Sequence, residues 1–392
     1  MSIFPCQVGS RQAIPIKTKC AFSVHRFCTR LTAVGCICSL LAFRHVSRLA
    51  DSHALPTQFG NPSSVKPLTN PTEWNSLCQL AMQRTNHSCE PRREPFPRVY
   101  DVFMFNDELT MLEIRMNELK DVVDYFVIAE ARMTFTAEPK RLHFHENAER
   151  FTFVADKIIH VSLQELSGET TWERERFHRN AMFEQGLSVP GKESRPGDIL
   201  LTSDIDEIPR SWVIEALRRC AGFEGHIVKF DMNFFYYSYL IRARENWSVK
   251  MATFVNGEGD YPKPFDVRNA EANEILFTDA GWHCSYCFPE LAQFRNKMRS
   301  FSHTELNLPK FLTQENIVRS IHSGVAFFSH VPGYFRHLNA SEIDAPAYVI
   351  EHAQRFHFLL DRTSPTAGLS DYDSPGSEES TTHVLSAAHD PP

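Results

Sequence analysis

The sequence predicts an α/β fold built on a mostly parallel sheet, and two observations support this prediction. First, residues 98–105 predict a buried strand, apolar residues at 109–119 recur at helical spacing, and 122–129 predict a second strand. This order is a βαβ unit, whose crossover is almost always right-handed. Second, a strand at 157–163, a charged helix around 172–185 and a strand at 199–201 continue the alternation. Strands that alternate with helices are typical of the parallel sheets that bind nucleotides.

The middle of the chain continues with one more helix and a long strand. A helix is expected over 211–220, with Ser211 as its N-cap. Residues 226–239 alternate in the manner of a long strand. One face of this strand should carry Val228, Phe230, Met232, Phe234 and Tyr236.

The N-terminal end of the chain differs from its middle. Residues 1–50 contain no Asp or Glu, and basic residues flank an uncharged run at 31–43. This run is shorter than the ~20 residues that span a typical bilayer. It fits a signal anchor or the apolar part of a signal peptide, and we expect the anchor. A disordered leader and a mitochondrial presequence are the alternative interpretations.

Composition divides the rest of the chain into three parts. Residues 51–97 are rich in Pro, Ser, Thr and Asn with weak periodicity, as in a stem or linker. Residues 98–362 are enough for one large core and form the predicted folded domain. Residues 363–392 are rich in Ser, Thr, Asp and Pro, and we expect them to be disordered. The net charge of −7 provides no basic field, so a nucleic-acid partner is not expected.

The spacing of four cysteines outside the leader indicates structural roles for them. Cys78 and Cys89 are close enough in sequence for a small disulfide loop. Cys284 and Cys287 form a C-x-x-C pair, which we interpret as a structural disulfide or as two packed thiols. A closed zinc site needs four ligands, and a thioredoxin-like pair would lie near the start of its domain. Neither alternative fits this position well.

The most informative segment is Thr202-Ser-Asp-Ile-Asp-Glu-Ile-Pro209. Asp204 and Asp206 are two residues apart on an extended chain, so both carboxylates can share one face. Open α/β sheets bind ligands beyond the C-terminal ends of their strands. Paired carboxylates suit Mg²⁺ or Mn²⁺ that also coordinates a substrate diphosphate. The segment therefore predicts the metal site of a nucleotide-sugar transferase, with a solvated acidic turn as the alternative.

Several other blocks lie in a fixed order around this segment. Those before it are Asn106-Asp-Glu-Leu with Glu113-Ile-Arg115, Asp121-Val-Val-Asp-Tyr-Phe-Val127 leading to Glu130, and Glu138-Pro-Lys140. Those after it are Gly281-Trp-His-Cys-Ser285 with Cys287-Phe288, and Ala345-Pro346 with Tyr348. Each block alone is a weak signal, but their colinear spacing is specific. From about residue 98 to 362 the chain resembles glycosyltransferase family 17.

The resemblance implies a GT-A-like nucleotide-sugar-binding fold, a divalent cation with Mn²⁺ as the expected ion, a UDP-sugar donor and inversion at the anomeric carbon. It also implies transfer of N-acetylglucosamine from UDP-GlcNAc to a mannose of an N-glycan in β-1,4 linkage. Thr202 and Ser203 stand where animal members of the family carry further acids. Asp206 is therefore a safer metal ligand than Asp204. Residues 268–280 match animal members poorly, and such peripheral segments usually set acceptor choice.

Five residues are candidates for the metal site and the chemistry. Asp204, Asp206 and His283 are the expected metal ligands, although His283 could instead hydrogen-bond the diphosphate or serve a structural role. An inverting transferase needs a general base, and Glu290 matches an acid of the family. Its alternative role is that of a carboxylate at a helix start. Glu207 is the second candidate, and it could also orient a ligand or lie on the surface.

Four residues are candidates for binding the donor. Arg115 and Glu130 lie near the ends of the first βαβ unit, where nucleotide contacts belong. Lys140 could pair with phosphate, although basic residues on loops are usually solvated. Trp282 offers a face on which a sugar ring can stack, and packing in the core is its alternative role.

These inferences predict a single-pass type II protein of the Golgi membrane, with its catalytic domain in the lumen. The expected partners are a UDP-sugar donor, a glycan acceptor on a glycoprotein, and the membrane. Glycosylation sequons at Asn86, Asn246 and Asn339 are compatible with that compartment. One alternative is a transferase with another donor or acceptor, such as a cell-wall glycan or a glycolipid. The other is a non-catalytic sugar-binding module that kept the fold.

Overall fold

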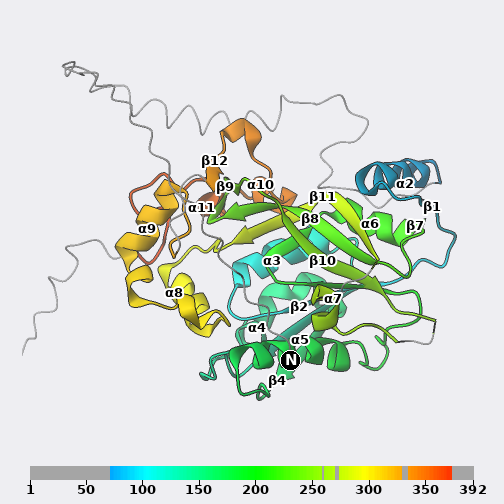
Figure 1. Cartoon of the computed structure of the whole chain (residues 1–392), viewed down its shortest axis with the longest axis horizontal. Helices are drawn as coiled ribbons and strands as arrows, with labels where there is room; N and C mark the ends of the chain where they lie inside the picture. The colour runs from blue at the N-terminus through cyan, green and yellow to red at the C-terminus, as the bar shows by residue number, and fades with distance from the viewer. Residues whose placement is uncertain (1–70, 258–259, 270–272, 329–333, 373–392) are drawn as a thin grey trace, which may run out of the picture. The chain divides into compact units, whose positions relative to one another are not determined.

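The structure, a computed structural model, describes residues 71–257, 260–269, 273–328 and 334–372 (Figure 1). The expected signal anchor at 31–43 lies outside these residues, as does the leader around it. Within the part of the chain that is described, no helix combines the length and the apolar character needed to cross a membrane.

One half of the sheet is parallel, as predicted, and contains the first βαβ unit. Among the described residues the sheet is 10-stranded; β2 lies between β3 and β5 and runs parallel to both, and β4 follows β3. The strands are β2 (Val99–Met104), β3 (Tyr125–Ala131), β4 (Ile158–Leu163) and β5 (Ile199–Ser203). The helices are α3 (Leu109–Leu119), α4 (His143–Glu146) and α5 (Thr171–Gly186), with a 3-10 segment at Ala148–Lys157. Nearly continuous burial along β2 and β3 is what a parallel sheet covered on both faces requires.

The other half of the sheet is mostly antiparallel, which corrects the prediction of a mostly parallel sheet. β10 pairs antiparallel with β5 and β8, β9 pairs antiparallel with β8, and β12 with β9. β11 runs parallel to β8 and pairs antiparallel with the short β6. The strands are β6 (Glu207–Pro209), β8 (Ile227–Tyr236), β9 (Ser238–Ala243), β10 (Trp247–Phe254), β11 (Glu274–Ser285) and β12 (Phe335–His337). A single residue, Tyr237, separates β8 from β9, and such a tight turn makes antiparallel neighbours, whereas a parallel pair needs a long crossover.

The single strand predicted over 226–239 is interrupted at Tyr237. This residue has a left-handed φ of 66° and lies between β8 and β9. The predicted alternation holds as far as Met232, which is buried in the main core cluster. Beyond it the faces change, because Phe235 joins that cluster whereas Phe234 packs with a second cluster. The change brings Phe234 to the wall of a cavity.

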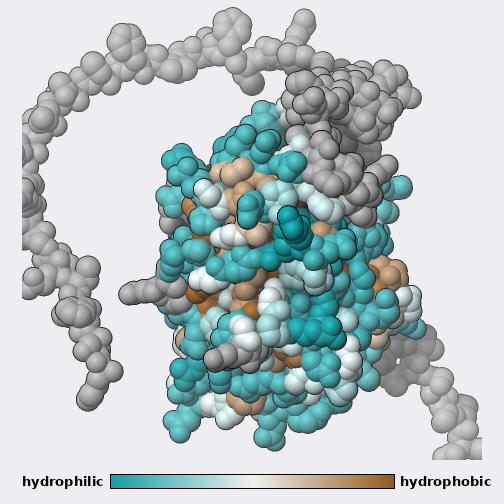
Figure 2. Space-filling model, turned by 90° about the vertical axis from the view of Figure 1, so that its right-hand side faces the viewer, coloured by the Kyte–Doolittle hydropathy of each residue, from teal (hydrophilic) through white to brown (hydrophobic). Residues whose placement is uncertain are grey.

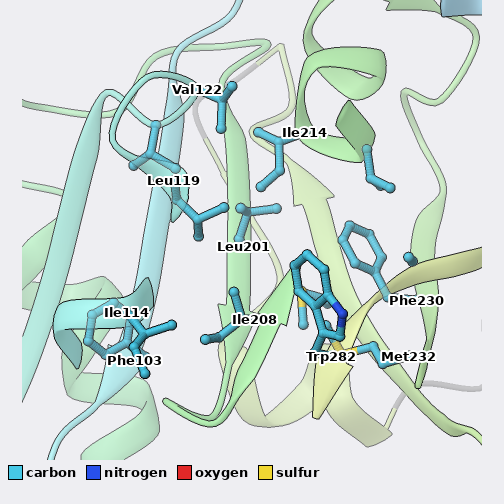
Figure 3. Close-up of a cluster of buried hydrophobic side chains, with 14 of the residues drawn as sticks. Phe103, Ile114, Leu119, Val122, Leu201, Ile208, Ile214, Phe230, Met232 and Trp282 are labelled. Atoms are coloured by element: carbon cyan, nitrogen blue, oxygen red, sulfur yellow. The ribbon is translucent and has the colours of Figure 1, made fainter. Parts of the chain in front are cut away.

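Helices cover both faces of the sheet (Figure 1). On one face of the parallel half, α5 packs Met182 and Phe183 among apolar residues of β2, β3 and β4. On the opposite face lie α3 and α6 (Ser211–Arg219), and Figure 3 shows the apolar side chains that meet there. They are Phe103, Ile114, Leu119, Val122, Leu201, Ile208, Ile214, Phe230, Met232 and Trp282. Ser211 is the first residue of α6, and Arg210 occupies the N-cap position predicted for Ser211.

The folded region begins before residue 98, inside the stretch predicted to be a stem. There, α2 (Pro71–Thr85) packs against β11 and α6 and buries Leu77 and Ala81. A separate two-stranded pairing follows it, formed by β1 (Glu90–Pro91) and β7 (Cys220–Ala221). The stem prediction missed α2 because so few of its residues are apolar that the periodicity is weak.

Two disulfides are present among the described cysteines. One joins Cys78 of α2 to Cys220, with their Cα atoms 5.7 Å apart. Cys89 is a free thiol, so the predicted Cys78–Cys89 bridge is wrong. The partner is distant in sequence because α2 packs on α6, directly before Cys220. The other disulfide joins Cys284 to Cys287, which confirms one of the two interpretations of the C-x-x-C pair.

The folded region also continues past residue 362, into the stretch predicted to be a disordered tail. Ala367 and Leu369 are buried in the cluster that includes residues of α8 and α9. Arg362 is itself buried and donates to the carbonyls of Tyr237 and Phe288. For residues 373–392, which lie outside the residues that the structure describes, disorder remains a prediction. The remaining helices are α7 (Pro264–Asn269), α8 (Leu291–Ser300), α9 (Gln314–Ser323), α10 (Ala347–Glu351) and α11 (His357–Leu360).

The face of the molecule in Figure 2 is mostly hydrophilic, with hydrophobic residues in scattered patches. This distribution is expected of a folded domain whose large apolar side chains lie in the core. Seven large apolar side chains are exceptions among the described residues, and two of these are tryptophans, Trp172 at 49% and Trp247 at 38% exposure.

Candidate active site

The acidic loop between β5 and β6 is held in place by Arg115 of α3. The Arg115 side chain is fully buried and forms a two-point ion pair with Asp101 of β2, at 2.6 and 2.8 Å. It also donates to Ser203 Oγ at 2.5 Å and to the carbonyls of Asp204 and Glu207 at 3.2 and 2.7 Å. The donor-binding role predicted for Arg115 is therefore corrected, because this buried side chain positions the loop instead.

Asp204 and Asp206 both line one cavity, but they bind different partners. Asp204 accepts hydrogen bonds from Arg179 at 2.8 Å and Arg268 at 3.3 Å. Asp206 accepts one from Lys297 of α8 at 3.0 Å. Burial opposes ionisation of both carboxyls, but the nearby cations outweigh it and hold the pKa of each below its usual range. Both side chains are therefore anions at neutral pH.

Glu207 is fully buried behind the loop and is absent from the cavity wall. Its carboxylate accepts hydrogen bonds from Arg268 and from Trp247 Nε1, each at 2.7 Å. It also accepts from the backbone N–H of Asp204 at 2.8 Å. Because both oxygens are bonded, Glu207 cannot take a proton from an acceptor hydroxyl here, and its predicted role as a base is corrected to one of orienting the loop.

His283 of β11 stands opposite the acidic loop. Its Nε2 lies 3.7 Å from Asp206 Oδ1, and its buried Nδ1 has no partner among the described residues. Phe234 stacks on the imidazole with the ring centroids 4.7 Å apart, and Trp247 packs beside it at 4.9 Å. A Cβ on Gly281 would lie 2.4 Å from the carbonyl oxygen of Ile208. Only glycine therefore lets β6 approach β11 closely enough to bring His283 to this position.

The cavity between these groups has a volume of about 410 Å³, within the range of small-molecule binding sites. Its wall combines ionisable, imidazole and aromatic side chains. The acids are Glu108, Glu175, Asp204 and Asp206, and the cations are Lys140, Arg179 and Lys297. The imidazoles are those of His178, His283 and His303. A cavity with this mixture can hold an anionic group and a sugar ring together.

Asp206 and His283 are the pair best placed to hold a divalent cation. Among the described residues no group of three or more His, Cys, Asp and Glu side chains could hold one. Ions such as Mg²⁺ are commonly bound by one or two carboxylates together with substrate phosphates, and Asp206 could supply such a carboxylate. Asp204 would first have to leave Arg179 and Arg268. The predicted set of three ligands is therefore not assembled.

Two further groups on the wall have unusual protonation equilibria. Burial raises the pKa of the Glu108 carboxyl, and the negative charge of Asp107 adds to this effect. Glu108 Oε2 accepts the backbone N–H groups of Asn106 and Asp107 at 3.2 and 3.1 Å. Burial lowers the pKa of His178 to about 3, so this imidazole is neutral. Its buried Nε2 has no partner among the described residues.

Of the four predicted donor-binding residues, the structure brings Lys140 alone to the cavity. It donates to the carbonyl of Asn106 at 3.1 Å, and burial lowers its pKa although nearby acids oppose this. Glu130 is buried and accepts the backbone N–H groups of Phe144 and His145, at 3.0 and 2.9 Å. It shapes the start of α4, so its predicted nucleotide contact is corrected.

Trp282 and Glu290 also lie away from the cavity wall. Trp282 is fully buried in the core shown in Figure 3, and its Nε1 donates to Asp344 at 2.8 Å. The structure therefore supports the core-packing role of Trp282. Glu290 is exposed and precedes the first residue of α8. Its alternative role at a helix start describes its position, and the prediction that it is the base is corrected.

A family model described as glycosyltransferase family 17 matches residues 66–364, more than half of the chain. The chain belongs to glycosyltransferase family 17. This confirms the resemblance predicted from the ordered blocks. The match begins before residue 98, in agreement with α2 being part of the folded domain.

Relatives in family 17 are similar over most of this chain. The beta-1,4-mannosyl-glycoprotein 4-beta-N-acetylglucosaminyltransferase of Homo sapiens is 28% identical over 320 residues, covering 73% of this chain and 59% of that protein. The proteins of the same name from Rattus norvegicus and Mus musculus are 27% and 26% identical, each covering 73% of this chain and 58% of its own length. The chain thus spans less than two thirds of the length of these relatives.

Several residues that line the cavity of this family 17 chain were not predicted from the sequence as site residues. Glu108 lies in the Asn106-Asp-Glu-Leu block, just after a parallel strand, and the rule that singled out Asp204 applies to it equally. Phe234 was assigned to an apolar strand face, where nothing distinguishes it from core residues. Lys297 carries no local signal, because a basic residue near the end of a helix is ordinary.

Proposed function

We propose that this chain is an N-acetylglucosaminyltransferase domain that transfers GlcNAc from UDP-GlcNAc to a mannose of a glycoprotein N-glycan in β-1,4 linkage. Family membership and the names of its relatives support the reaction class and the mannosyl-glycoprotein acceptor. The observation that carries the proposal is the position of Asp206, His283 and Lys297 on one cavity wall. This wall lies beyond the C-terminal end of β5, where α/β sheets bind ligands.

Asp206 and His283 would hold the divalent cation, for which Mn²⁺ is the expected ion. When bound, the ion would neutralise charge on the departing nucleoside diphosphate. Arg115 and Arg268 keep the acidic loop in place from its buried side. The protein thereby fixes the orientation of Asp206 before any ligand arrives, which lowers the cost of binding.

We also propose Glu108 as the general base of a single inverting displacement. Its carboxylate lines the cavity, and its partners among the described residues are backbone N–H groups. Two backbone N–H groups fix its Oε2, which leaves Oε1 for an acceptor hydroxyl. A carboxylate whose pKa is raised is a stronger base than an ordinary one, which suits a general base. Glu175 is a poorer candidate, since it binds Arg179 and the Ser302 hydroxyl.

The proposal is tested by transfer from UDP-GlcNAc to a mannose-terminated N-glycan in the presence of Mn²⁺. Asp206→Asn should abolish most turnover while keeping the fold, because the carboxylate lines a cavity and does not pack in the core. Asp156→Asn, a change at an exposed residue outside the cavity, is the matched control and should leave turnover unchanged. A wild-type chain that binds the glycan but neither transfers nor hydrolyses UDP-GlcNAc would instead be a sugar-binding module.

We further propose a Golgi lumenal location with a type II anchor at 31–43. Two disulfides support an oxidising compartment. Asn86, Asn246 and Asn339 are exposed and so accessible for glycosylation. Protease added to intact microsomes should spare the domain, and glycosidase treatment should increase its gel mobility. Digestion of the domain in intact microsomes would exclude this topology.

A further inference from the structure

Lys297 is the least completely bound cation of the cavity. An ammonium group has three N–H donors, and among the described residues Lys297 hydrogen-bonds to Asp206 Oδ2 alone, at 3.0 Å. The ammonium also lies near the rings of Tyr286 and Phe288, 5.1 and 5.6 Å from their centroids. Its side chain is 19% exposed. Lys297 therefore has donors left for a ligand.

The other cations on the wall have more protein partners. Arg179 pairs with Glu175 and Asp204 at 3.0 and 2.8 Å. Lys140 donates to two backbone carbonyls, those of Asn106 and Arg141, at 3.1 and 3.4 Å. Among the three cations on the wall, Lys297 is therefore the one that an entering anion can bind with the smallest change to existing hydrogen bonds.

Among the described residues, the hydrogen-bond partner of Lys297 is the carboxylate best placed to hold a divalent cation. Lys297 bonds to Oδ2, whereas Oδ1 is the oxygen that faces His283, so Lys297 and the ion would share one carboxylate and its single negative charge. Burial by itself would lower the pKa of Lys297. The charges of Asp206 and Glu108 outweigh burial and raise this pKa above its usual value, so the ammonium stays charged. The competition is between two permanent cations and does not depend on protonation of the lysine.

The backbone around Lys297 is held firmly, whereas its side chain is long and flexible. At the start of α8, Asp371 accepts the N–H groups of Leu291 and Ala292 at 2.6 and 2.9 Å. Asn296, the residue before Lys297, donates to Asp107 at 2.6 Å. A change of partner is therefore a rotation of the four-carbon side chain and needs no movement of α8.

We propose that Lys297 binds the diphosphate of the nucleotide sugar and that, until it does, it occupies Asp206 in place of the metal ion. Arrival of the diphosphate takes the ammonium away from Asp206 and frees this carboxylate for the ion. Donor and metal thereby assist each other, since each favours the arrangement that the other needs. This role rests on the proposed function, because it requires a nucleoside diphosphate in the cavity.

Calorimetric titration of the whole chain with UDP and with uridine, both in EDTA, tests the first part. Lys297→Met should weaken UDP binding about ten- to hundredfold, the loss expected for a hydrogen bond to a charged group. Uridine, which lacks phosphate, should bind to wild type and variant alike. Lys263→Met is the matched control, since this lysine pairs with Glu184 on the surface, and it should change neither affinity.

Titration with MnCl₂ in the absence of nucleotide tests the second part. Lys297→Met should bind Mn²⁺ more tightly than wild type, because the competitor for Asp206 is gone. Asp206→Asn should strengthen UDP binding in EDTA, because it releases Lys297, and this gain should vanish in the Lys297→Met background. Such a double-mutant cycle isolates the coupling between the two residues. Lys297→Arg keeps the charge and should retain UDP binding, and circular dichroism verifies the fold of each variant.

The outcomes separate the role proposed for Lys297 from the proposed function on which it rests. Equal weakening of UDP and uridine in Lys297→Met would mean a structural role and would overturn the assignment. Unchanged Mn²⁺ affinity, or a gain from Asp206→Asn that persists without Lys297, would overturn the competition. A wild-type chain that binds neither UDP nor uridine would contradict the proposed function itself.

Discussion

The two halves of the sheet contribute different things to the cavity. The parallel half supplies the acidic loop and Glu108, both at the C-terminal ends of neighbouring strands. The half that contains β8, β10 and β11 supplies Phe234, Trp247 and His283. One half thus carries most of the charge, and the other carries most of the aromatic surface on which a ring can stack.

The difference shows why the halves were not equally predictable. In the parallel half, β2, β3 and β4 are neighbours in the sheet and follow one another along the chain, and β5, which pairs with β2, is the exception. In the other half, β11 lies beside β8 in parallel, while β6 pairs with β11 across more than sixty intervening residues. Pairings over such distances leave no periodic signal in either partner, so they are decided by the packing of the whole domain.

The largest expected effect tests whether the parallel half performs the chemistry. Glu108→Gln should lower transfer by the ~10²–10⁴-fold that general base catalysis commonly contributes, while leaving UDP-GlcNAc binding nearly unchanged. Activity of the wild type should rise with pH through the raised pKa of Glu108, because the base must be ionised. Glu290→Gln is the matched control on the exposed start of α8. A larger loss in Glu290→Gln than in Glu108→Gln would reverse the assignment.

The next prediction concerns the stability of the charged half. Arg115→Met leaves Asp101 buried without its partner and should cost about 3–5 kcal/mol of unfolding free energy. Arg150→Met removes a more exposed pair with Glu113 and should cost no more than about 1 kcal/mol. Denaturant unfolding of both variants measures the difference. Similar losses in the two variants would mean that Arg115 does not support the loop as described.

A third prediction tests the connection of α2 to the domain. The double change Cys78→Ser with Cys220→Ser opens a bridge between residues 142 apart in sequence and should cost about 2–4 kcal/mol. Cys89→Ser, which alters a free thiol, should have little effect. Thermal melts under non-reducing conditions compare them. Peptide mapping that finds Cys78 joined to Cys89 would show that the covalent connection is a different one.

The smallest predicted effect lies where the C-terminal segment meets α3. Burial raises the pKa of Glu118 to about 7, although backbone N–H groups of Ala347 and Tyr348 oppose this. The folded state therefore holds the proton more tightly than the unfolded state, so the contribution of Glu118 to stability falls as pH rises from about 4.5 to 7. Glu118→Gln should gain about 2–3 kcal/mol over wild type at pH 8 and little at pH 4.5. Denaturation at the two pH values measures this, and an equal gain at both would contradict it.

The sequence by itself determined the family and the parallel βαβ core, and it singled out Asp204, Asp206 and His283 as candidates for the site. These features depend on local patterns, namely strand and helix periodicity, a two-residue spacing between carboxylates, and short ordered blocks. It also indicated that Lys140 could face phosphate. Each of these residues lies on the cavity wall because strand ends gather at one edge of a sheet.

Only the tertiary structure decided which polar residues near the strand ends face the cavity and which are buried and hold the nearby backbone in place. Arg115, Glu130 and Glu207 lie on or beside the predicted strands, but their side chains bond to backbone groups and are absent from the cavity wall. Lys297 reaches Asp206 from a helix 91 residues away in sequence. Local pattern can place a residue at the end of a strand. The choice of face and of distant partner comes from packing and charge pairing over the whole domain, because a buried polar group must find whichever partner the fold brings to it.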